Sequence, residues 1–358
     1  MSPLLFWLPP GAQRSEKLYT RMKLPHRSLR LLAACARSAA SLSSTLARYT
    51  TPTTVCGAPC RRLLCLGDGD LSCSAALADA GVDVTATTLD TRDDLARKYD
   101  ADTAGRFDRL CAIGGVDATA PGDLGDAFDR VIFNFPHVAG KQNIGRNREL
   151  LHALCGATGA LLAPGGELLI ALDGGQAGCT GELPTGAGRQ GAWKRSWQLD
   201  AAAAESGLVV AETLPFEPFY DTRGHRGEQH ARAFEPKRAV LHALTVSGAA
   251  VAASAPSYVF EVQFFSDAVD DETVCEALRR ALGGLAHSVR RADLFQRADG
   301  RISHAFEVTL ATRDASLSRS RADEVRQTVE AEVEGLLGVR LRMEKTGRLV
   351  SNALPWPE

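Results

Sequence analysis

The chain has 358 residues, of which 45% are hydrophobic and 23% charged, and its formal net charge is −2. This composition is typical of a globular protein that is long enough for two domains. No apolar run reaches the roughly 20 residues that a membrane-spanning helix needs, so we expect no membrane partner.

Charge is unevenly distributed along the chain. Residues 1–62 contain ten basic residues and one acid, whereas residues 63–253 contain 17 basic and 25 acidic residues. An RNA-binding surface in the folded part must therefore be a local patch. The basic extension, residues 1–61, is rich in Arg, Ser, Ala and Leu, which is typical of a mitochondrial targeting peptide. An unstructured basic tail on a nucleolar or cytoplasmic protein is the alternative.

The nine cysteines include no C-x-x-C pair. Cys65, Cys73, Cys111 and Cys155 lie in apolar stretches, which favours small buried thiols in a reducing compartment. We therefore expect no metal site.

From residue 63 onward, buried strands alternate with helices. Strands are expected at 63–67, 82–90, 110–119, 128–135, 167–175, 208–216 and 238–246. Helices are expected at 73–81, 91–100, 147–166 and 193–207. This alternation predicts a doubly wound α/β sheet, and five strand–helix units before a terminal strand pair predict a class I methyltransferase Rossmann-like domain over 62–246.

The remaining residues predict a second domain. The small-residue segment 247–256 is expected to be a structureless linker. The pattern that follows is strand 257–265, helix 270–284, strands 288–297 and 303–313 around an Asp-Gly turn, helix 318–338 and strand 339–343. This order predicts a ferredoxin-like βαββαβ (α+β) domain over 257–345, followed by a tail, 346–358.

A glycine–acid loop follows the first strand. Gly67, Asp68, Gly69 and Asp70 lead into a helix that begins near Ser72. Glycine permits a tight turn and close approach to a ligand, but the spacing differs from the G-x-G-x-x-G of dinucleotide sites. The acids would repel phosphate and suit an amino group, such as that of S-adenosylmethionine.

Two more acids follow the next strands. Asp90 ends the second strand, where a carboxylate accepts hydrogen bonds from both ribose hydroxyls, with a helix N-cap as the alternative. Asp117 ends the third strand and is expected either to bind an adenine amino group or to be an ordinary turn acid.

The fourth strand ends in Asn134-Phe135-Pro136-His137. Proline stiffens this turn, Phe135 offers a stacking face and Asn134 an amide for a base, and His137 titrates near neutrality and could accept a proton. The alternative is that Phe135 packs in the core and His137 lies on the surface.

Two loops complete the candidate surfaces. The glycine-rich segment 176–192 is long enough to predict a flexible lid. Arg223, Arg226 and Lys237 lie near Tyr220, and basic groups among aromatics suit RNA contacts. A solvated loop is the alternative for this basic cluster.

Together these segments resemble a known family. GDGDLS, TTLD, GVDAT, FDRVIFNFPH, KQNIGRNRELL, LAPGGELLIAL and WQLDAAAAESGL follow in order the motifs of the yeast 25S ribosomal RNA uridine-N3 methyltransferase family, over about 62–245. SHAFEVTLATRDASLSRSRADEV and GVRLR, within 257–343, resemble the ferredoxin-fold anticodon-binding domain of mitochondrial phenylalanyl-tRNA synthetases.

The resemblance implies S-adenosylmethionine as cofactor and RNA as substrate, with ribosomal RNA first and transfer RNA second. It places the base at Asn134 and Phe135, the proton at His137, the methionine end at Asp68 and Gly69, the ribose at Asp90 and the adenine at Asp117. A transfer-RNA methyltransferase, and an RNA-binding protein that keeps the fold without catalysis, are the alternatives. The sequence does not indicate an oligomeric state.

Overall fold

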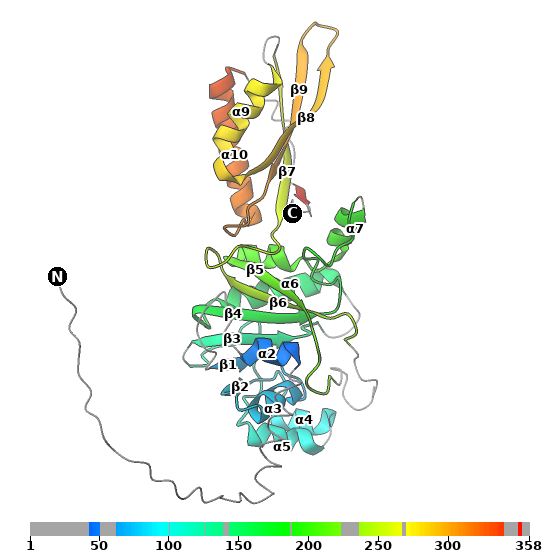
Figure 1. The fold of residues 1–358 in the computed structure, drawn as a ribbon, viewed down its shortest axis with the longest axis vertical. Helices are drawn as coiled ribbons and strands as arrows, with labels where there is room; N and C mark the ends of the chain where they lie inside the picture. The colour runs from blue at the N-terminus through cyan, green and yellow to red at the C-terminus, as the bar shows by residue number, and fades with distance from the viewer. Residues whose placement is uncertain are drawn as a thin grey trace, which may run out of the picture. The chain divides into compact units, whose positions relative to one another are not determined.

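The structure is a computed structural model that describes residues 43–50, 62–99, 101–125, 127–138, 143–186, 188–222, 236–266, 270–339 and 350–352. Most of the basic extension, on which the targeting prediction rests, lies outside these ranges. The described residues form two sheets, each with its own hydrophobic core (Figure 1). None of their helices is long and apolar enough to cross a membrane.

The first sheet has six strands in the order β2-β1-β3-β4-β6-β5. Their bounds are β1 Leu63–Cys65, β2 Val84–Ala86, β3 Phe128–Asn134, β4 Leu162–Leu172, β5 Leu208–Pro215 and β6 Val240–Val246. Strands β1 to β4 pair in parallel, whereas β6 is antiparallel to both of its neighbours. This is the strand arrangement of class I methyltransferases, so the predicted α/β Rossmann-like fold is confirmed.

One predicted strand is nearly absent. Of the stretch 110–119, only Ile113 pairs with the sheet, through a parallel bridge to Thr87. Two glycines follow Ile113, and Gly115 has a φ of +74°, which ends an extended run. Cys111, expected to be a buried thiol, is exposed with a φ of +49°, so that expectation is wrong.

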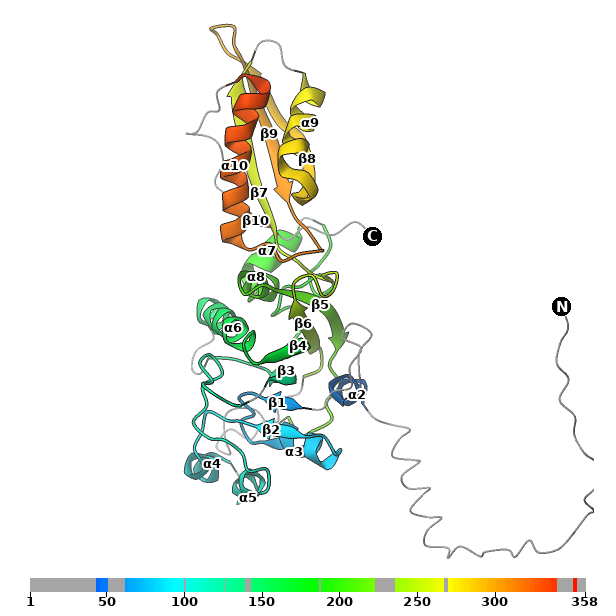
Figure 2. The same cartoon turned by 90° about the vertical axis from the view of Figure 1, so that its left-hand side faces the viewer.

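Helices cover both faces of the first sheet. Their bounds are α2 Ser44–Thr50, α3 Ser72–Asp79, α4 Arg92–Lys98, α5 Ala101–Arg109, α6 Ile144–Thr158, α7 Gly188–Arg195 and α8 Leu199–Glu205. Side chains alternate along β1: Leu64 packs in the core with α6 and α8, whereas Leu63 and Cys65 pack with α2 and α3. Figure 2 shows α6 and α2 on opposite sides of the sheet.

Helix α2 corrects the predicted domain boundary. Its residues were assigned to the extension 1–61, yet Tyr49 is fully buried in the core with β1 and β3. Arg48 forms a double hydrogen bond to Glu167 on β4, at 2.9 Å for both contacts, and also pairs with Glu212 on β5. The Rossmann-like domain therefore begins by Ser43 and not at residue 62.

Two predicted helices differ from those observed. The helix expected over 147–166 ends at Thr158, because the residues from Leu162 onward join β4. The helix expected over 193–207 is divided into α7 and α8 at Gln198, whose φ of +56° is incompatible with a continuous helix. Trp193 of α7 and Trp197, which directly precedes Gln198, are both buried.

The second domain has the βαββαβ order. Its elements are β7 Ser257–Phe265, α9 Asp271–Leu282, a 3-10 turn Gly283–Leu285, β8 Ala286–Gln296, β9 Ile302–Leu310, α10 Arg319–Leu337 and β10 Val350–Asn352. The sheet order is β10-β7-β9-β8, and every pair is antiparallel, as in ferredoxin-like domains. The last described strand lies at 350–352; of the strand predicted at 339–343, residues 340–343 are outside the described residues.

Local signals explain where the helices of this domain begin and end. The Asp270 carboxylate accepts the Thr273 N–H at 2.9 Å before α9, and Ser318 caps α10 through the Arg321 N–H at 3.1 Å. Helix α10 ends at Gly338, whose φ is +62°. The expected hairpin turn forms at Asp299-Gly300, where Gly300 has a φ of +87°.

The segment 247–256 is packed rather than structureless. Ala252 and Ser254 are buried, and the Ala253 N–H donates to the Val210 carbonyl of β5 at 2.8 Å. Small side chains allow this close approach to the strand, which explains the composition that suggested a linker.

Candidate functional site

A hollow lies at the carboxyl ends of β1 and β3, where ligands bind in open α/β sheets. The hollow spans about 520 Å³, a volume that includes space open to solvent. The lining residues come from β1 and its loop, α3, β3 and two further segments: Cys65, Leu66, Gly67, Asp68, Gly69, Asp70, Ser72, Cys73, Tyr99, Ile132, Asn134, Phe135, Tyr220 and Thr222.

Gly67 is required where the chain leaves β1. Its φ is +57°, and a Cβ at this position would lie 2.7 Å from the ring of Phe133 on β3. Any larger residue would push the loop off β3 and out of the pocket wall. The glycine predicted to permit close approach is therefore needed first for packing against Phe133.

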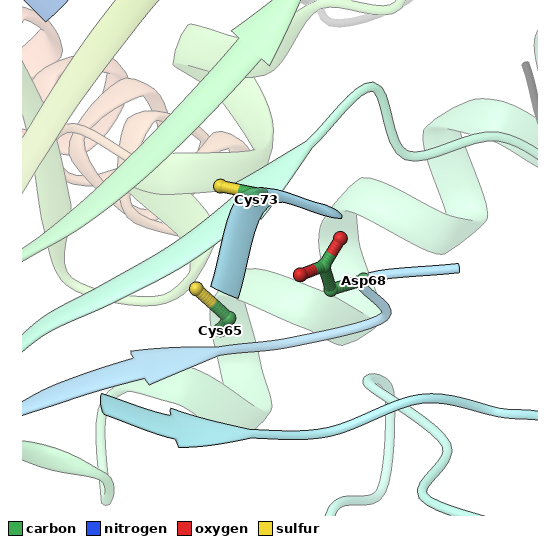
Figure 3. A group of neighbouring side chains, drawn as sticks. All are labelled: Cys65, Asp68 and Cys73. Atoms are coloured by element: carbon green, nitrogen blue, oxygen red, sulfur yellow. The ribbon is translucent and has the colours of Figure 1, made fainter. Parts of the chain in front are cut away.

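Asp68 is the acid of the loop whose carboxyl group lies deepest. Ser74 donates to its Oδ2 through the backbone N–H and the hydroxyl, both at 2.6 Å. Burial raises the pKa of Asp68 to about 6 despite these hydrogen bonds. Figure 3 shows its carboxylate near Cys65 of β1 and Cys73 of α3, and the three groups lie within 4.8 Å of one another.

Asp70 and Ser72 have mainly structural partners. The Ser72 N–H and hydroxyl donate to Asp70 Oδ1 at 3.1 and 2.6 Å, which stabilises the start of α3. Arg106 lies 3.7 Å from the Asp70 carboxylate and donates to its backbone carbonyl at 2.9 Å. Both residues line the pocket, but Arg106, which is not part of the lining, offsets the negative charge of Asp70.

Asn134 reaches the pocket at the end of β3. Its Oδ1 accepts the Tyr49 hydroxyl at 2.7 Å, and its Nδ2 lies 3.4 Å from Cys73 Sγ, to which it donates. These two contacts fix the direction of the amide. Arg130 donates to the Tyr49 carbonyl at 2.6 Å and thereby holds Tyr49 against β3.

Phe135 belongs to an aromatic wall. Its φ of +53° is strained for a bulky residue, and strain of this kind is concentrated at functional sites. The ring packs edge-on against Phe216 at 5.1 Å, and Phe216 packs against Tyr220. Phe135 thus lines the hollow and also packs against the core, and its role as a stacking face for a base stays a prediction.

Four predicted residues do not line the hollow. Asp90 forms an ion pair with Lys98, and Asp117 is an exposed turn acid that accepts the Thr119 N–H and hydroxyl at 2.8 and 2.7 Å. These Thr119 hydrogen bonds lower the pKa of Asp117. Pro136 is buried behind Asn134 and Phe135, and His137 is exposed outside the lining.

The predicted RNA-binding cluster is only partly described. Arg223 and Arg226 lie outside the described residues, and Lys237 is exposed on the approach to β6. Neighbouring Tyr220 belongs to the pocket, where burial raises the pKa of its phenol well above the usual value.

Sequence reasoning missed Cys65, Cys73, Tyr99 and Tyr220 as pocket residues, and it missed Tyr49 as the partner of Asn134. The two cysteines carried a weak signal, because they flank the glycine–acid loop. Tyr49 carried none, since it lies at the end of a basic, low-complexity stretch and meets Asn134 only in the fold.

Comparisons with known proteins agree with the motif series. Residues 64–221 match the family described as "rRNA (uridine-N3-)-methyltransferase BTM5-like", which confirms the predicted resemblance over somewhat less than half of the chain. The mouse "Ferredoxin-fold anticodon-binding domain-containing protein 1 homolog" is 35% identical over 204 residues, and its human counterpart is 33% identical over 201. These alignments cover 52% of this chain and 31% of each relative, so the chain matches about a third of their length.

Solved structures give weaker likenesses. TrmN from Thermus thermophilus matches with 17% identity and a TM-score of 0.32, covering 56% of this chain and 47% of TrmN. The 16S rRNA methyltransferase KamB matches with 16% identity and a TM-score of 0.32, covering 52% of this chain and 87% of KamB.

Proposed function

We propose that the chain is an S-adenosylmethionine-dependent RNA methyltransferase of the ribosomal RNA uridine-N3 type. One observation carries the proposal: the pocket joins the glycine–acid loop after β1 to the Asn134 amide at the end of β3. Both lie within the residues that match the uridine-N3 methyltransferase family.

The lining fits the charge of the cofactor. S-adenosylmethionine carries a positive sulfonium and an ammonium group, and the described lining includes Asp68 and Asp70 but no lysine or arginine. Asp68 and Gly69 would hold the methionine end, and bound there the cofactor would supply an electrophilic methyl group. Asp90 is a weaker candidate for the ribose, because Lys98 already neutralises it.

The residues of the chain would mainly position the base. Uridine N3 would lose its proton to solvent and take the methyl group by in-line displacement at the methyl carbon, as the S–C bond breaks and S-adenosylhomocysteine leaves. Alignment of this kind accounts for much of the acceleration in bimolecular reactions. The fixed Asn134 amide would orient the pyrimidine edge, and the aromatic wall of Phe135 and Tyr220 would exclude water. A target base in a helix would first have to leave its stack.

Calorimetry with S-adenosylmethionine tests the cofactor assignment on the full chain. Asp68→Asn is expected to weaken binding by at least tenfold, because it removes the deepest negative charge of the lining. Asp117→Asn is the matched control, since Asp117 is exposed outside the hollow, and it should bind as the wild type does. Equal binding by all three proteins would contradict the placement of the cofactor.

A transfer RNA substrate is the second candidate. The ferredoxin-like domain favours it, because the names of the mouse and human relatives contain an anticodon-binding domain of this fold. Nucleoside mass spectrometry of both RNA classes from cells that lack the protein separates the two substrates. Loss of N3-methyluridine from ribosomal RNA alone would support the first candidate.

A further inference from the structure

A second buried cluster lies away from the cofactor hollow, between the loop that follows β4 and strand β6. From this cluster we propose that Cys179, Glu182 and His242 bind a zinc-class divalent metal ion. The proposal is independent of the methyltransferase assignment.

The three side chains converge from two parts of the chain. One ligand atom of each, the Cys179 Sγ, a Glu182 carboxylate oxygen and a His242 ring nitrogen, lies within 4.8 Å of the other two. Cys179 and His242 are fully buried, and the Glu182 side chain is 4% exposed. His242 is held opposite Ile170 by the antiparallel pairing of β6 with β4.

The contacts of His242 require a proton or a metal ion between its Nε2 and Glu182. Its Nδ1 lies 3.1 Å from the Ile170 carbonyl, an acceptor, so Nδ1 carries a proton. In the neutral ring Nε2 is then a bare lone pair, yet it faces Glu182 Oε2 at 3.1 Å. Two acceptors at this distance repel each other unless a proton or a metal ion lies between them.

The surroundings favour a metal ion over a proton alone. A carbonyl partner on Nδ1 is the usual second contact of a metal-binding histidine, because it directs Nε2 toward the metal. The Glu182 carboxylate is oriented in the same way, accepting the Gly175 N–H at 3.3 Å and the Cys179 N–H at 3.1 Å. The Cys179 sulfur, within 4.8 Å of both groups, adds a third metal-binding atom that a shared proton would not need.

The donor set selects the class of metal. Sulfur, imidazole nitrogen and one carboxylate oxygen are ligands of zinc and similar transition metals, whereas magnesium and calcium take oxygen ligands. Binding would require the Cys179 thiol to lose its proton to solvent, as for zinc thiolates generally.

The other mixed cluster, Cys65, Asp68 and Cys73, is a weaker candidate. It contains no histidine, and its Asp68 and Cys73 accept hydrogen bonds from Ser74 and Asn134. It also lines the cofactor hollow. Substitution of its two cysteines therefore serves as a control for the proposal that Cys179 binds the metal ion.

A metal ion here would tie the long loop to the sheet. The loop was expected to be a flexible lid, yet the Trp197 N–H donates to the Gln176 carbonyl at 2.6 Å and the Leu199 N–H to the Ala177 carbonyl at 3.0 Å. The ion would add a cross-link from this loop to β6, and its removal should lower the midpoint of thermal unfolding.

Metal analysis of the full chain tests the site. After dialysis against limiting Zn²⁺ we expect about one tightly held ion per chain. The Co²⁺-loaded protein should show a thiolate-to-cobalt charge-transfer band. Glu182→Gln should retain the fold, because its amide can donate to neutral His242 Nε2, and should lower the metal content at least tenfold. Cys179→Ser should lose the charge-transfer band.

Two controls make the outcome decisive. Cys155→Ser removes a buried thiol of α6 that belongs to neither cluster and should leave the metal content unchanged. A double Cys65→Ser, Cys73→Ser variant should also keep the ion. The proposal is overturned if wild-type protein holds no metal, which would leave a proton between His242 and Glu182, or if only the double variant loses it.

Discussion

Asn134 is the residue on which the candidate site depends, and a tyrosine 85 positions earlier fixes its direction. The Tyr49 hydroxyl occupies one lone pair of Asn134 Oδ1, so the amide cannot rotate freely toward a base or away from it. An active-site group held in this way retains its geometry as the substrate arrives, which is how preorganised sites lower a barrier.

Removing the Tyr49 hydroxyl should therefore impair turnover more than cofactor binding. A neutral hydrogen bond contributes about 1 kcal/mol, so Tyr49→Phe is expected to lower kcat/KM on the order of fivefold to tenfold. The dissociation constant of S-adenosylmethionine should stay unchanged, as measured by calorimetry. Tyr258→Phe, a buried tyrosine of the second domain, is the control. Equal activity of both variants would show that Asn134 needs no such support.

Asp68 should make cofactor binding depend on pH. Its pKa is raised to about 6, so the carboxyl group is neutral below that pH and negative above it. Affinity for the cationic cofactor is thus expected to rise as pH increases from about 5 to 7, and Asp68→Asn should flatten this dependence. The same raised pKa means that Asp68 stabilises the fold below pH 3.8 and that this contribution is lost as pH rises through 6. A pH-independent affinity in the wild type would contradict the assignment.

For individual residues, the sequence predicted where the pocket lies better than it predicted which side chains contact one another there. Gly67, Asp68 and Asn134 were predicted because glycine and polar residues at the carboxyl ends of parallel strands are typical of ligand sites in this fold. Asp117 and His137 were not distinguished from surface residues, because a turn acid and a strand-end ligand look alike before the chain is folded. Tyr220 reaches the pocket, and Tyr49 reaches Asn134, only through packing of distant segments.

Helix α2 shows how an element can be misassigned from composition. Seven residues at the end of a basic stretch pack against β3, β4 and β5, held by Arg48, Arg130 and Glu167. The basic, acid-poor composition of this stretch gave no sign that it ends in a buried tyrosine and a buried arginine. Periodicity is uninformative over so short a helix, whose formation depends on tertiary contacts.

Breaking the Arg48 contacts should destabilise the domain. Arg48→Ala leaves Glu167 buried with Arg130 as its remaining partner, at 3.3 Å, and loss of one member of a buried pair costs about 3 kcal/mol. Urea unfolding would measure this loss. Arg92→Ala removes an exposed pair with Asp108 and should leave the unfolding midpoint unchanged. Similar midpoints for both variants would mean that α2 contributes nothing to the fold.

A shortened chain locates the boundary of the domain. A variant that begins at Ser43 should bind S-adenosylmethionine as the full chain does, whereas one that begins at Arg62 should lose binding, because Tyr49 and Arg48 are gone. Calorimetry and circular dichroism would compare the two. If targeting removes part of the extension, cleavage must lie before residue 43. Full binding by the shorter variant would restore the predicted boundary at 62.

Across the whole molecule, alternating strands and helices correctly predicted the α/β fold of the first domain and the βαββαβ element order of the second. The doubly wound sheet and the βαββαβ order follow from periodicity and turn residues, which are local signals. The packing of residues 247–256 on β5 and the pairing of residues 350–352 with β7 depend on long-range contacts. A local pattern does not contain that information.

Methyl transfer by the full chain tests the central claim most directly. Purified protein would be incubated with labelled S-adenosylmethionine and ribosomal or transfer RNA, and the RNA digested for nucleoside mass spectrometry. We expect label in N3-methyluridine, with little or none in reactions of Asn134→Ala. Absence of labelled nucleosides from both RNAs, with cofactor binding intact, would contradict the account and leave an RNA-binding protein that keeps a methyltransferase fold.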